Sequence, residues 1–430
     1  MTLLKLRTIR ILTASLFTGL LIGIVGGLFR LLLATADNLR NALITWAHTW
    51  VYIGWLAPLG LGLIGATLAR LLVVRLAPEA EGSGVQRVEA VFTGEAQPST
   101  QPILPVKFFG GILAIGSGLA LGREGPTVQM GSSLARLVSR LWITDYKDAR
   151  IVDAAGAGAG LAVAFNAPVG GSVFVFEELA SSFSPWLLIA TLAAAISAVW
   201  IMRLMLGNQF DFAVQQASFN TGSKEWPFLV LGMLLGIIGA LYNWLIFRLL
   251  RWTDGICWLT TVQTAALIGA SIGLAAWFTP ALVGGGDNVT QAVLSGRFAM
   301  EGLTTIFVLR FFIGPWSYAA RAPGGLFAPM LVVGASFGAL FAGVMNYLNP
   351  HAEVSALACA VVGMGTLFSA CVRAPLTGVI LTVEMTGRGD LTFGLLGGSL
   401  MAIVIAMLLN SEPIYETLKR QMLQKTVTVK

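Results

Sequence analysis

Long apolar stretches, separated by short polar ones, run through almost the whole of this 430-residue chain. Several reach the roughly 20 residues that an α-helix needs to cross a bilayer, whereas others are shorter. We interpret Ile11–Leu33 as the first membrane helix, because no convincing signal-peptide cleavage site follows it. Gly110-Gly111, Gly116 and Pro329 are expected to interrupt the shorter helices. The remaining apolar stretches are Val51–Leu76, Val106–Leu121, Trp186–Leu206, Phe228–Leu249, Leu259–Phe278, Thr304–Trp316, Leu326–Leu348, Ser355–Val372 and Leu391–Leu409.

The composition supports a polytopic membrane protein. Hydrophobic residues make up 56% of the chain and charged residues only 11%, whereas soluble domains carry about 25% charged residues. Broken helices are tolerated at membrane depth only where the freed backbone is buried in protein or lines a cavity. The predicted fold class is therefore an all-α membrane protein with some discontinuous helices.

The net charge of +6 does not indicate nucleic-acid binding, because the positive residues flank the apolar stretches. They gather near the N-terminus, between Arg136 and Arg150, and from Lys419 to Lys430. Basic flanks mark the cytoplasmic side of a membrane protein. Both termini are therefore predicted to be cytoplasmic, with an even number of crossings.

No metal or cofactor is expected. Cys257, Cys359 and Cys371 lie in or beside apolar stretches without pairing or metal-ligand spacing, so they are predicted to be packing residues. His48 and His351 fall in predicted interfacial loops, which argues against a histidine-based metal site.

An internal repeat is visible in the sequence. The segment from Gly156 to Glu177 matches the segment from Gly363 to Glu384 at a constant offset of 207, including an Ala-Pro pair and the terminal glutamate. A second block agrees at an offset of 203, where Gly122, Pro126, Gly131, Ser133 and Leu137 fall on Gly325, Pro329, Gly334, Ser336 and Leu340. Repeated halves with interrupted hydrophobic segments indicate a transporter with its site near the midplane.

The repeat divides the chain into four parts. Residues 1–206 are predicted to form the first transmembrane repeat, and residues 228–410 the second. The polar stretch 207–227 joins them, and residues 411–430 form a short cytoplasmic tail.

Three glycine-rich breaks are each able to begin a helix: Gly82-Ser83-Gly84-Val85, Gly122–Pro126 and Gly324–Pro329. Helix N-termini carry about half a positive charge and free N–H donors. Three of them together would bind a small anion without a full cation, which leaves the anion free to depart. The Ser83 hydroxyl can add a further donor.

Glu124 is the only carboxylate in Ser117–Met130 and lies inside one of these breaks. Ionised, it would compete with an anion for the amides; protonated, it would lose most of that attraction. The residues alone leave two simpler roles open. Glu124 could pair with the adjacent Arg123, and Glu177 and Glu178 could simply cap helices at the membrane edge.

These segments resemble the signature segments of the CLC family of chloride channels and chloride/proton exchangers, in the family's order from about Gly82 to Tyr415. The resemblance implies a homodimer in which each subunit has its own pore, formed by two inverted halves of tilted, partly discontinuous helices. It also implies that chloride and protons are the transported ions and that no cofactor is needed.

The resemblance assigns roles to single residues. Ser83, the amides of Leu326 and Phe327, and the hydroxyl of Tyr415 match the ligands of the central chloride. Glu124 matches the external gating glutamate, and Glu178 the internal glutamate that passes protons. The predicted anion-binding set also includes Gly122, Arg123 and Gly125, whereas the predicted structural set is Gly82, Gly84, Pro126, Glu177 and Glu384.

Two residues depart from the family pattern. Gln86 stands where proline is common, which puts the start of that helix in question. Arg321 stands where small residues are common and could add an anion-attracting charge.

The resulting hypothesis is a chloride/proton antiporter in the cytoplasmic membrane of a bacterium. The alternatives are a passive chloride channel and a fluoride/proton antiporter on the same fold. A membrane-embedded hydrolase is a third alternative, but the sequence offers no Ser-His, His-Glu or paired Asp constellation for it.

Overall fold

The computed structural model describes residues 2–50, 52–180, 183–214 and 225–428. Within these ranges the chain is built from helices, with no β-strand beyond a single isolated bridge between Gly122 and Gly325. Residues 215–224, part of the predicted join between the halves, lie outside the described residues.

The helices of the first half run from α1 to α8. Their bounds are α1 Thr2–Ala47, α2 Leu56–Leu76, α3 Val85–Thr93, α4 Ile103–Gly116, α5 Glu124–Trp142, α6 Tyr146–Phe165, α7 Pro168–Phe174, the π-helical segment η2 Val175–Ala180, and α8 Pro185–Leu206, with the short 3₁₀ turn η1 Pro78–Ala80 before α3.

The second half runs from α9 to α17. Its bounds are α9 Trp226–Asp254, α10 Thr261–Phe278, α11 Asp287–Leu294, α12 Met300–Tyr318, α13 Phe327–Leu348, α14 Ala356–Val372, α15 Pro375–Thr386, α16 Thr392–Leu408 and α17 Ile414–Thr428, with the short turns η3 Pro280–Leu282, η4 Pro350–Ala352 and η5 Gly389–Leu391.

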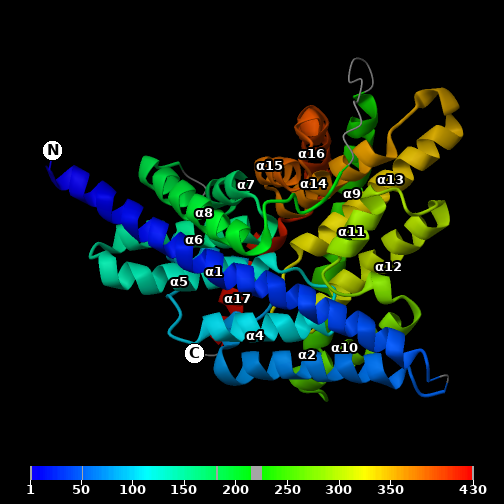
Figure 1. Cartoon of the computed structure of the whole chain (residues 1–430), viewed down its shortest axis with the longest axis horizontal. Coiled ribbons are helices and arrows are strands. Elements are labelled where there is room, and N and C mark those ends of the chain that lie inside the picture. Colours follow the sequence, from blue (N-terminus) through cyan, green and yellow to red (C-terminus); the bar gives the residue numbers. More distant parts are fainter. Residues whose placement is uncertain (1, 51, 181–182, 215–224, 429–430) are drawn as a thin grey trace.

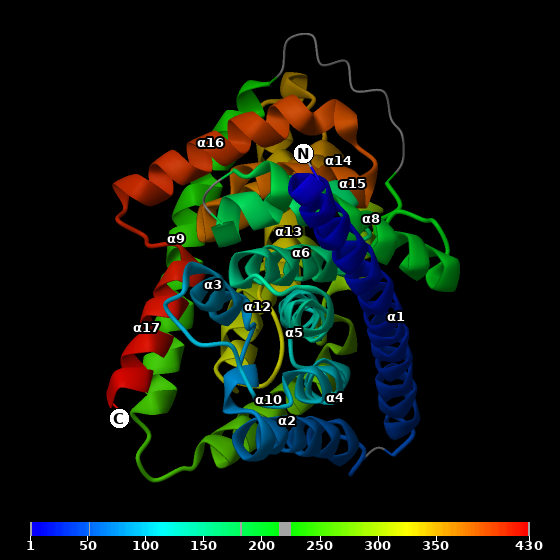
Figure 2. The same cartoon turned by 90° about the vertical axis from the view of Figure 1, so that its left-hand side faces the viewer.

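Among the described residues, seven helices are long and apolar enough to cross a membrane: α1, α2, α8, α9, α10, α13 and α16 together with η5. Figure 1 shows α1 as a long rod along one face of the helical bundle. In Figure 2, α5 and α6 lie centrally, with α2 and α10 along one edge and α14 to α16 along the opposite edge. The protein is a multi-pass membrane protein.

Two expectations need correction, one about the length of the first helix and one about a helix break. The predicted first membrane helix Ile11–Leu33 is only the middle of α1, which is 46 residues long. Gly110 and Gly111 do not interrupt a helix, because α4 continues through both. They permit close packing instead: a Cβ atom on Gly110 would lie 2.9 Å from Pro323, and one on Gly111 would lie 2.8 Å from Phe29.

The other two expected breaks lie at helix ends. Gly116 is the last residue of α4. Pro329 is the third residue of α13, within the first turn, where a proline removes no hydrogen bond of the helix.

The two halves meet through equivalent residues. The amide of Gly122 donates to the carbonyl oxygen of Gly325 at 2.9 Å, and the amide of Gly325 donates back at 2.7 Å. These glycines are the repeat equivalents at the offset of 203. A residue can pair reciprocally with its own equivalent only where the two halves face each other across an approximate two-fold axis. That axis therefore passes between the two glycine-rich loops.

The same relation appears in helix packing. A Cβ atom on Gly131 would overlap the carbonyl oxygen of Gly156, and one on Gly334 would overlap that of Gly363. The close α5–α6 contact of the first half is thus repeated as the α13–α14 contact of the second. The division at residues 206 and 228 stays a prediction, although α8 ends at Leu206 and α9 begins at Trp226.

Candidate anion and proton site

The three glycine-rich breaks do begin helices, as predicted: α3 at Val85, α5 at Glu124 and α13 at Phe327. Gln86 is the second residue of α3, so the missing proline does not prevent the helix from starting there. Gly84 precedes α3 with φ of 88°, a left-handed conformation that favours glycine.

Hydrogen bonds between the loops hold the three helix starts together. The amide of Gly324 donates to the carbonyl oxygen of Gly82 at 3.1 Å, which joins the α13 loop to the α3 loop. The Gly122–Gly325 bridge joins the α13 loop to the α5 loop. The positive ends of three helices therefore face a common region.

Glu124 lies in that region and is 1% exposed. Its Oε1 accepts a hydrogen bond from the amide of Phe327 at 2.6 Å, so the carboxylate lies at the N-terminus of α13. Its Oε2 is buried and has no hydrogen-bond partner within the described protein. The carboxylate is thus bound as an anion by a helix N-terminus of the other half.

The glycines around this carboxylate provide the space for it. A Cβ atom on Gly122 would overlap Oε2 of Glu124, and one on Gly325 would overlap Oε1. A Cβ atom on Gly125 would lie 2.5 Å from the hydroxyl oxygen of Ser83. A side chain at Gly122 or Gly325 would fill the space around the carboxylate, which we call the cradle, and one at Gly125 would collide with Ser83.

Ser83 and Tyr415 lie beside the cradle. Ser83 is completely buried, and its hydroxyl oxygen has no hydrogen-bond partner within the described residues. Tyr415, the second residue of α17, is 2% exposed and near enough to Ser83, Glu124 and Glu178 for electrostatic interaction. The structure therefore brings together Ser83, Glu124, Phe327 and Tyr415.

One of the predicted anion-binding residues is engaged differently in this structure, and another stays untested. The amide of Gly122 is bonded to Gly325, so it ties the loops together and is not open to an anion. Leu326, the residue before the first helical residue of α13, is completely buried, and its amide role stays a prediction.

The Arg123 side chain does not pair with the Glu124 carboxylate. Its guanidinium donates to Asp287 at 2.7 Å, to Asp211 at 2.9 Å and to the carbonyl oxygen of Ala164 at 2.7 Å. The alternative interpretation, an ion pair between Arg123 and Glu124, is therefore wrong. With its donors taken, Arg123 braces the loop that carries Glu124, and its guanidinium is not a free anion ligand here.

Asp211 lies after α8, in the polar stretch predicted merely to join the halves. It also accepts from Arg30 of α1 at 2.6 Å, and its side chain is only 4% exposed. This carboxylate thus ties α1 to the loop before α5. No sequence pattern pointed to this role, because Arg30 is 181 positions away from Asp211.

Lys107 is a buried residue that the sequence-based prediction missed. It is completely buried in α4, and its ammonium donates to the carbonyl oxygens of Gly82 at 2.6 Å and Ser83 at 3.0 Å. It therefore fixes the loop that carries the serine hydroxyl. A lone lysine at the start of the apolar stretch Val106–Leu121 was the available signal, since ionisable residues within membrane segments are usually functional.

Glu178 lies in the π-helical segment η2, a form of helix that often marks functional sites. Its charged neighbours are Glu89, Glu177, Glu416 and Lys419. They belong to α3, η2 and α17, so Glu178 faces the C-terminal helix, whereas Glu124 faces the cradle. In Figure 2, α3 and α17 lie on the opposite side of α5 from α1.

Glu177 and Glu384 exchange caps between the halves. Glu177 accepts from the amide of Leu376 at 3.0 Å and from both the amide and the hydroxyl of Thr377 at 2.7 Å, at the start of α15. Glu384 accepts from the amides of Val169 at 3.1 Å and Gly170 at 2.6 Å, at the start of α7. Each glutamate thus satisfies orphan donors of the other half.

The chemistry of the cradle suits an anion and a proton rather than a metal ion. Across residues 2–50, 52–180, 183–214 and 225–428, no group of three or more His, Cys, Asp or Glu side chains is placed to hold a metal ion. The cradle offers amide and hydroxyl donors, which suit an anion. It also offers one carboxylate that can carry a proton.

A bundle of apolar helices whose broken starts converge on a buried carboxylate is typical of membrane proteins that move ions. The family model described as voltage gated chloride channel matches residues 65–407, so the chain belongs to this family. Its fold is the all-α membrane fold of CLC proteins, with two inverted repeats.

The chain is similar to proteins named H(+)/Cl(-) exchange transporter ClcA. It is 38% identical to one from Vibrio cholerae, covering 96% of this chain and 91% of that protein. It is 35% identical to one from Klebsiella pneumoniae, covering 96% of this chain and 89% of that protein. Among solved structures, a slow cyanobacterial Cl-/H+ antiporter matches with a TM-score of 0.92 and 32% identity, over 97% of this chain and 98% of that one.

Proposed function

We propose that this protein exchanges chloride for protons across a bacterial cytoplasmic membrane. One observation carries the proposal: the Glu124 carboxylate binds the amide of Phe327, where a chloride ion would bind. An ionised acid and a halide would be rivals for the same donors. The exchange function named for the relatives supports the same conclusion.

In the proposed cycle, protonation of Glu124 weakens its hold on the Phe327 amide and lets the side chain leave the cradle. Chloride then binds between the helix starts, with the hydroxyls of Ser83 and Tyr415 and the amides of Leu326 and Phe327 as ligands. Glu178 passes the proton to and from the side that carries α17. Tyr415 lies near both glutamates, so the proton and chloride routes diverge beside it.

The proposal extends to assembly and orientation. We expect a homodimer with a separate pore in each subunit, both termini in the cytoplasm, and no cofactor. Under this orientation, the cavity of about 160 Å³ lined by Arg30, Gly122, Arg123 and Asp287 opens toward the outside.

A reconstitution experiment tests the function. Purified protein in vesicles should move protons when only a chloride gradient is imposed, and a pH-sensitive dye trapped inside would report it. Protein-free vesicles with the same gradient are the control. Chloride flux without proton movement would identify the passive channel instead, and proton movement driven only by a fluoride gradient would identify the fluoride antiporter.

A further inference from the structure

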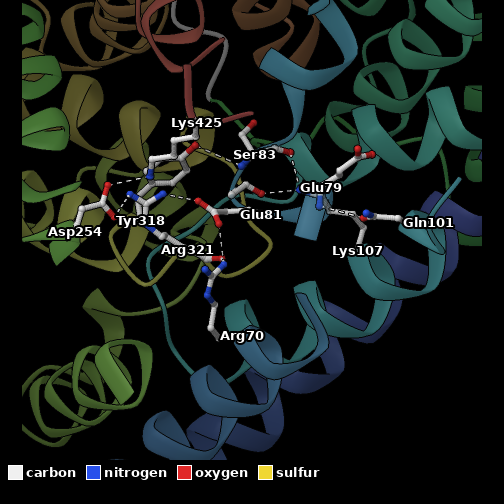
Figure 3. A network of polar contacts seen from close by, with 11 residues as sticks. Arg70, Glu79, Glu81, Ser83, Gln101, Lys107, Asp254, Tyr318, Arg321 and Lys425 are labelled. Atoms are coloured by element: carbon white, nitrogen blue, oxygen red, sulfur yellow. Dashed lines mark hydrogen bonds and ion pairs between the residues drawn. The ribbon is translucent and has the colours of Figure 1, made fainter. Parts of the chain in front are cut away.

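Glu81 and Arg321 form an ion pair directly beside the predicted chloride site (Figure 3). Glu81 is two residues before Ser83, and Arg321 is three residues before Gly324, so the pair joins the α3 loop to the α13 loop. Arg321 has φ of 53°, a left-handed conformation that an arginine rarely adopts. The contacts of its side chain therefore help to hold an unfavourable backbone.

Arg70 of α2 binds both members of this ion pair. Its Nη1 donates to Oε2 of Glu81 at 3.0 Å and to the carbonyl oxygen of Arg321 at 3.0 Å. The Glu81 carboxylate is thus shared between two guanidinium groups, as Figure 3 shows. This accounts for one of the two departures from the family pattern, since Arg321 does not present an isolated charge.

The chain of contacts continues to the C-terminal helix. Nη2 of Arg321 lies 2.7 Å from Asp254, the last residue of α9, and Asp254 lies 2.9 Å from the ammonium of Lys425 in α17. The Asp254 and Lys425 side chains are 40% and 59% exposed, so water and salt screen this outer pair. The side chains of Arg70 and Arg321 are only 7% and 14% exposed, whereas Glu81 between them is 36% exposed, so the two guanidinium groups are the less screened charges beside the site.

A cavity of about 800 Å³ reaches this cluster from the side of α17. Glu81, Gly82, Tyr318, Arg321 and Lys425 are among its lining residues. Gly82 is the residue before Ser83, and the amide of Ser83 lies 3.4 Å from the hydroxyl oxygen of Tyr318. An anion in this cavity would therefore meet the ion pair on its way to Ser83.

We propose that Glu81 and Arg321 are positioning residues that set how tightly the Ser83 site holds chloride. The inference rests on the proposed function. Arg70, Arg321 and Lys425 together outnumber Glu81 and Asp254 by one, which leaves the cluster with one net positive charge. Arg321 raises the attraction for an anion, and Glu81 limits it, so that chloride binds and still leaves. The same pair keeps the two loops in register.

The two single neutralisations distinguish an electrostatic role from a brace. Glu81→Gln leaves two positive charges unopposed and should lower the half-saturating chloride concentration about three- to tenfold. Arg321→Gln leaves the cluster neutral and should raise it about three- to tenfold. The double variant Glu81→Gln/Arg321→Gln keeps one positive charge, from Arg70, and should return to within about twofold of the unaltered protein. A purely structural brace predicts that all three variants weaken binding together.

The measurement is chloride binding to detergent-purified protein by calorimetry, paired with chloride-dependent exchange in vesicles. Arg321→Lys retains the charge and should retain the affinity, which separates charge from loss of folding. Arg10→Gln is the matched control, because it neutralises an exposed cation of α1 that does not line this cavity, and it should change affinity less than about twofold.

Two outcomes would overturn the inference. Shifts of Glu81→Gln and Arg321→Gln in the same direction, with exchange intact in the unaltered protein, would contradict it while leaving the proposed function standing. A chloride affinity of the double variant that differs more than about twofold from that of the unaltered protein would also contradict the inference. If the unaltered protein neither binds chloride nor moves protons, the proposed function fails first, and this inference fails with it.

Discussion

The loops that begin α5 and α13 are equivalent halves of one cradle, yet only one of them carries an acid. Both present a glycine to the Gly122–Gly325 bridge, and both have a proline in the third position of the helix. At the first helical position, Glu124 of one half corresponds to Phe327 of the other, 203 positions later. The carboxylate binds the amide of its own equivalent.

Phe327 is used for packing. Its ring centroid lies 4.5 Å from that of Phe165 and 4.3 Å from that of Phe368. The same contrast recurs at the next pair: Glu177 and Glu384 are equivalent and each caps a helix of the other half, whereas Glu178 corresponds to Met385. What the halves share builds the scaffold. The residues that differ between the halves carry the proposed chemistry.

The strongest test of this comparison is Glu124→Ala. Without the carboxylate, nothing competes with chloride for the Phe327 amide and nothing there carries a proton. We expect coupled proton movement to fall to that of protein-free vesicles while chloride still passes. Phe327→Leu, at the equivalent position, should keep the coupling because the donor is a backbone amide. Coupling that survives in Glu124→Ala would contradict the gating role.

Glu178→Ala should have the next largest effect. The variant removes the proposed proton carrier near α17 but leaves the cradle untouched, so proton movement should stop and chloride flux should remain within about twofold. The control is Met385→Ala, at the equivalent position of the second half, which should leave the ratio of proton to chloride flux unchanged. Equal effects of the two substitutions would remove the asymmetry on which the proposal depends.

Gly122→Ala is expected to uncouple the protein only in part. The three atoms nearest to an added Cβ all belong to the Glu124 carboxyl group, so a flexible side chain is displaced and the backbone is spared. Protons moved per chloride should fall severalfold. Adding this substitution to Glu124→Ala should change nothing further, because no carboxylate remains to displace. Gly60→Ala, with open space around it, serves as the control.

The smallest effect should be a loss of stability. Glu177→Ala and Glu384→Ala each remove a carboxylate that accepts two backbone N–H groups, which is worth about 1–2 kcal/mol. Both variants should lower the unfolding temperature in detergent and leave the coupling ratio unchanged, with the larger loss for Glu177→Ala because Glu177 also accepts from the hydroxyl of Thr377. A change in coupling would show that one of these glutamates takes part in transport.

The site could be predicted from the sequence mainly where local rules operate. Helix starts at Val85, Glu124 and Phe327 follow from glycine-rich breaks, and the repeat predicted which residues would be equivalent. Local rules led to the wrong result at Gly110-Gly111, because glycine can permit close packing as readily as it can end a helix.

Long-range polar contacts could not be predicted in the same way. Nothing in the chain's periodicity places Arg321 against Glu81, which is 240 positions away, or Arg123 against Asp287, which is 164 positions away. These contacts depend on how the halves pack. Lys107 is the exception, because a single charge inside the apolar stretch Val106–Leu121 is a local signal that points to a buried role.

The reciprocal Gly122–Gly325 contact also bears on how the protein is made. Gly122 is synthesised about 200 residues before Gly325. The first half of the chain therefore enters the bilayer with the Glu124 carboxylate but without the Phe327 amide that binds it in the folded protein. Assembly of the pocket must await insertion of the remaining portion. Two separately translated fragments, cut between α8 and α9, should therefore be inert alone and regain exchange when they are produced together.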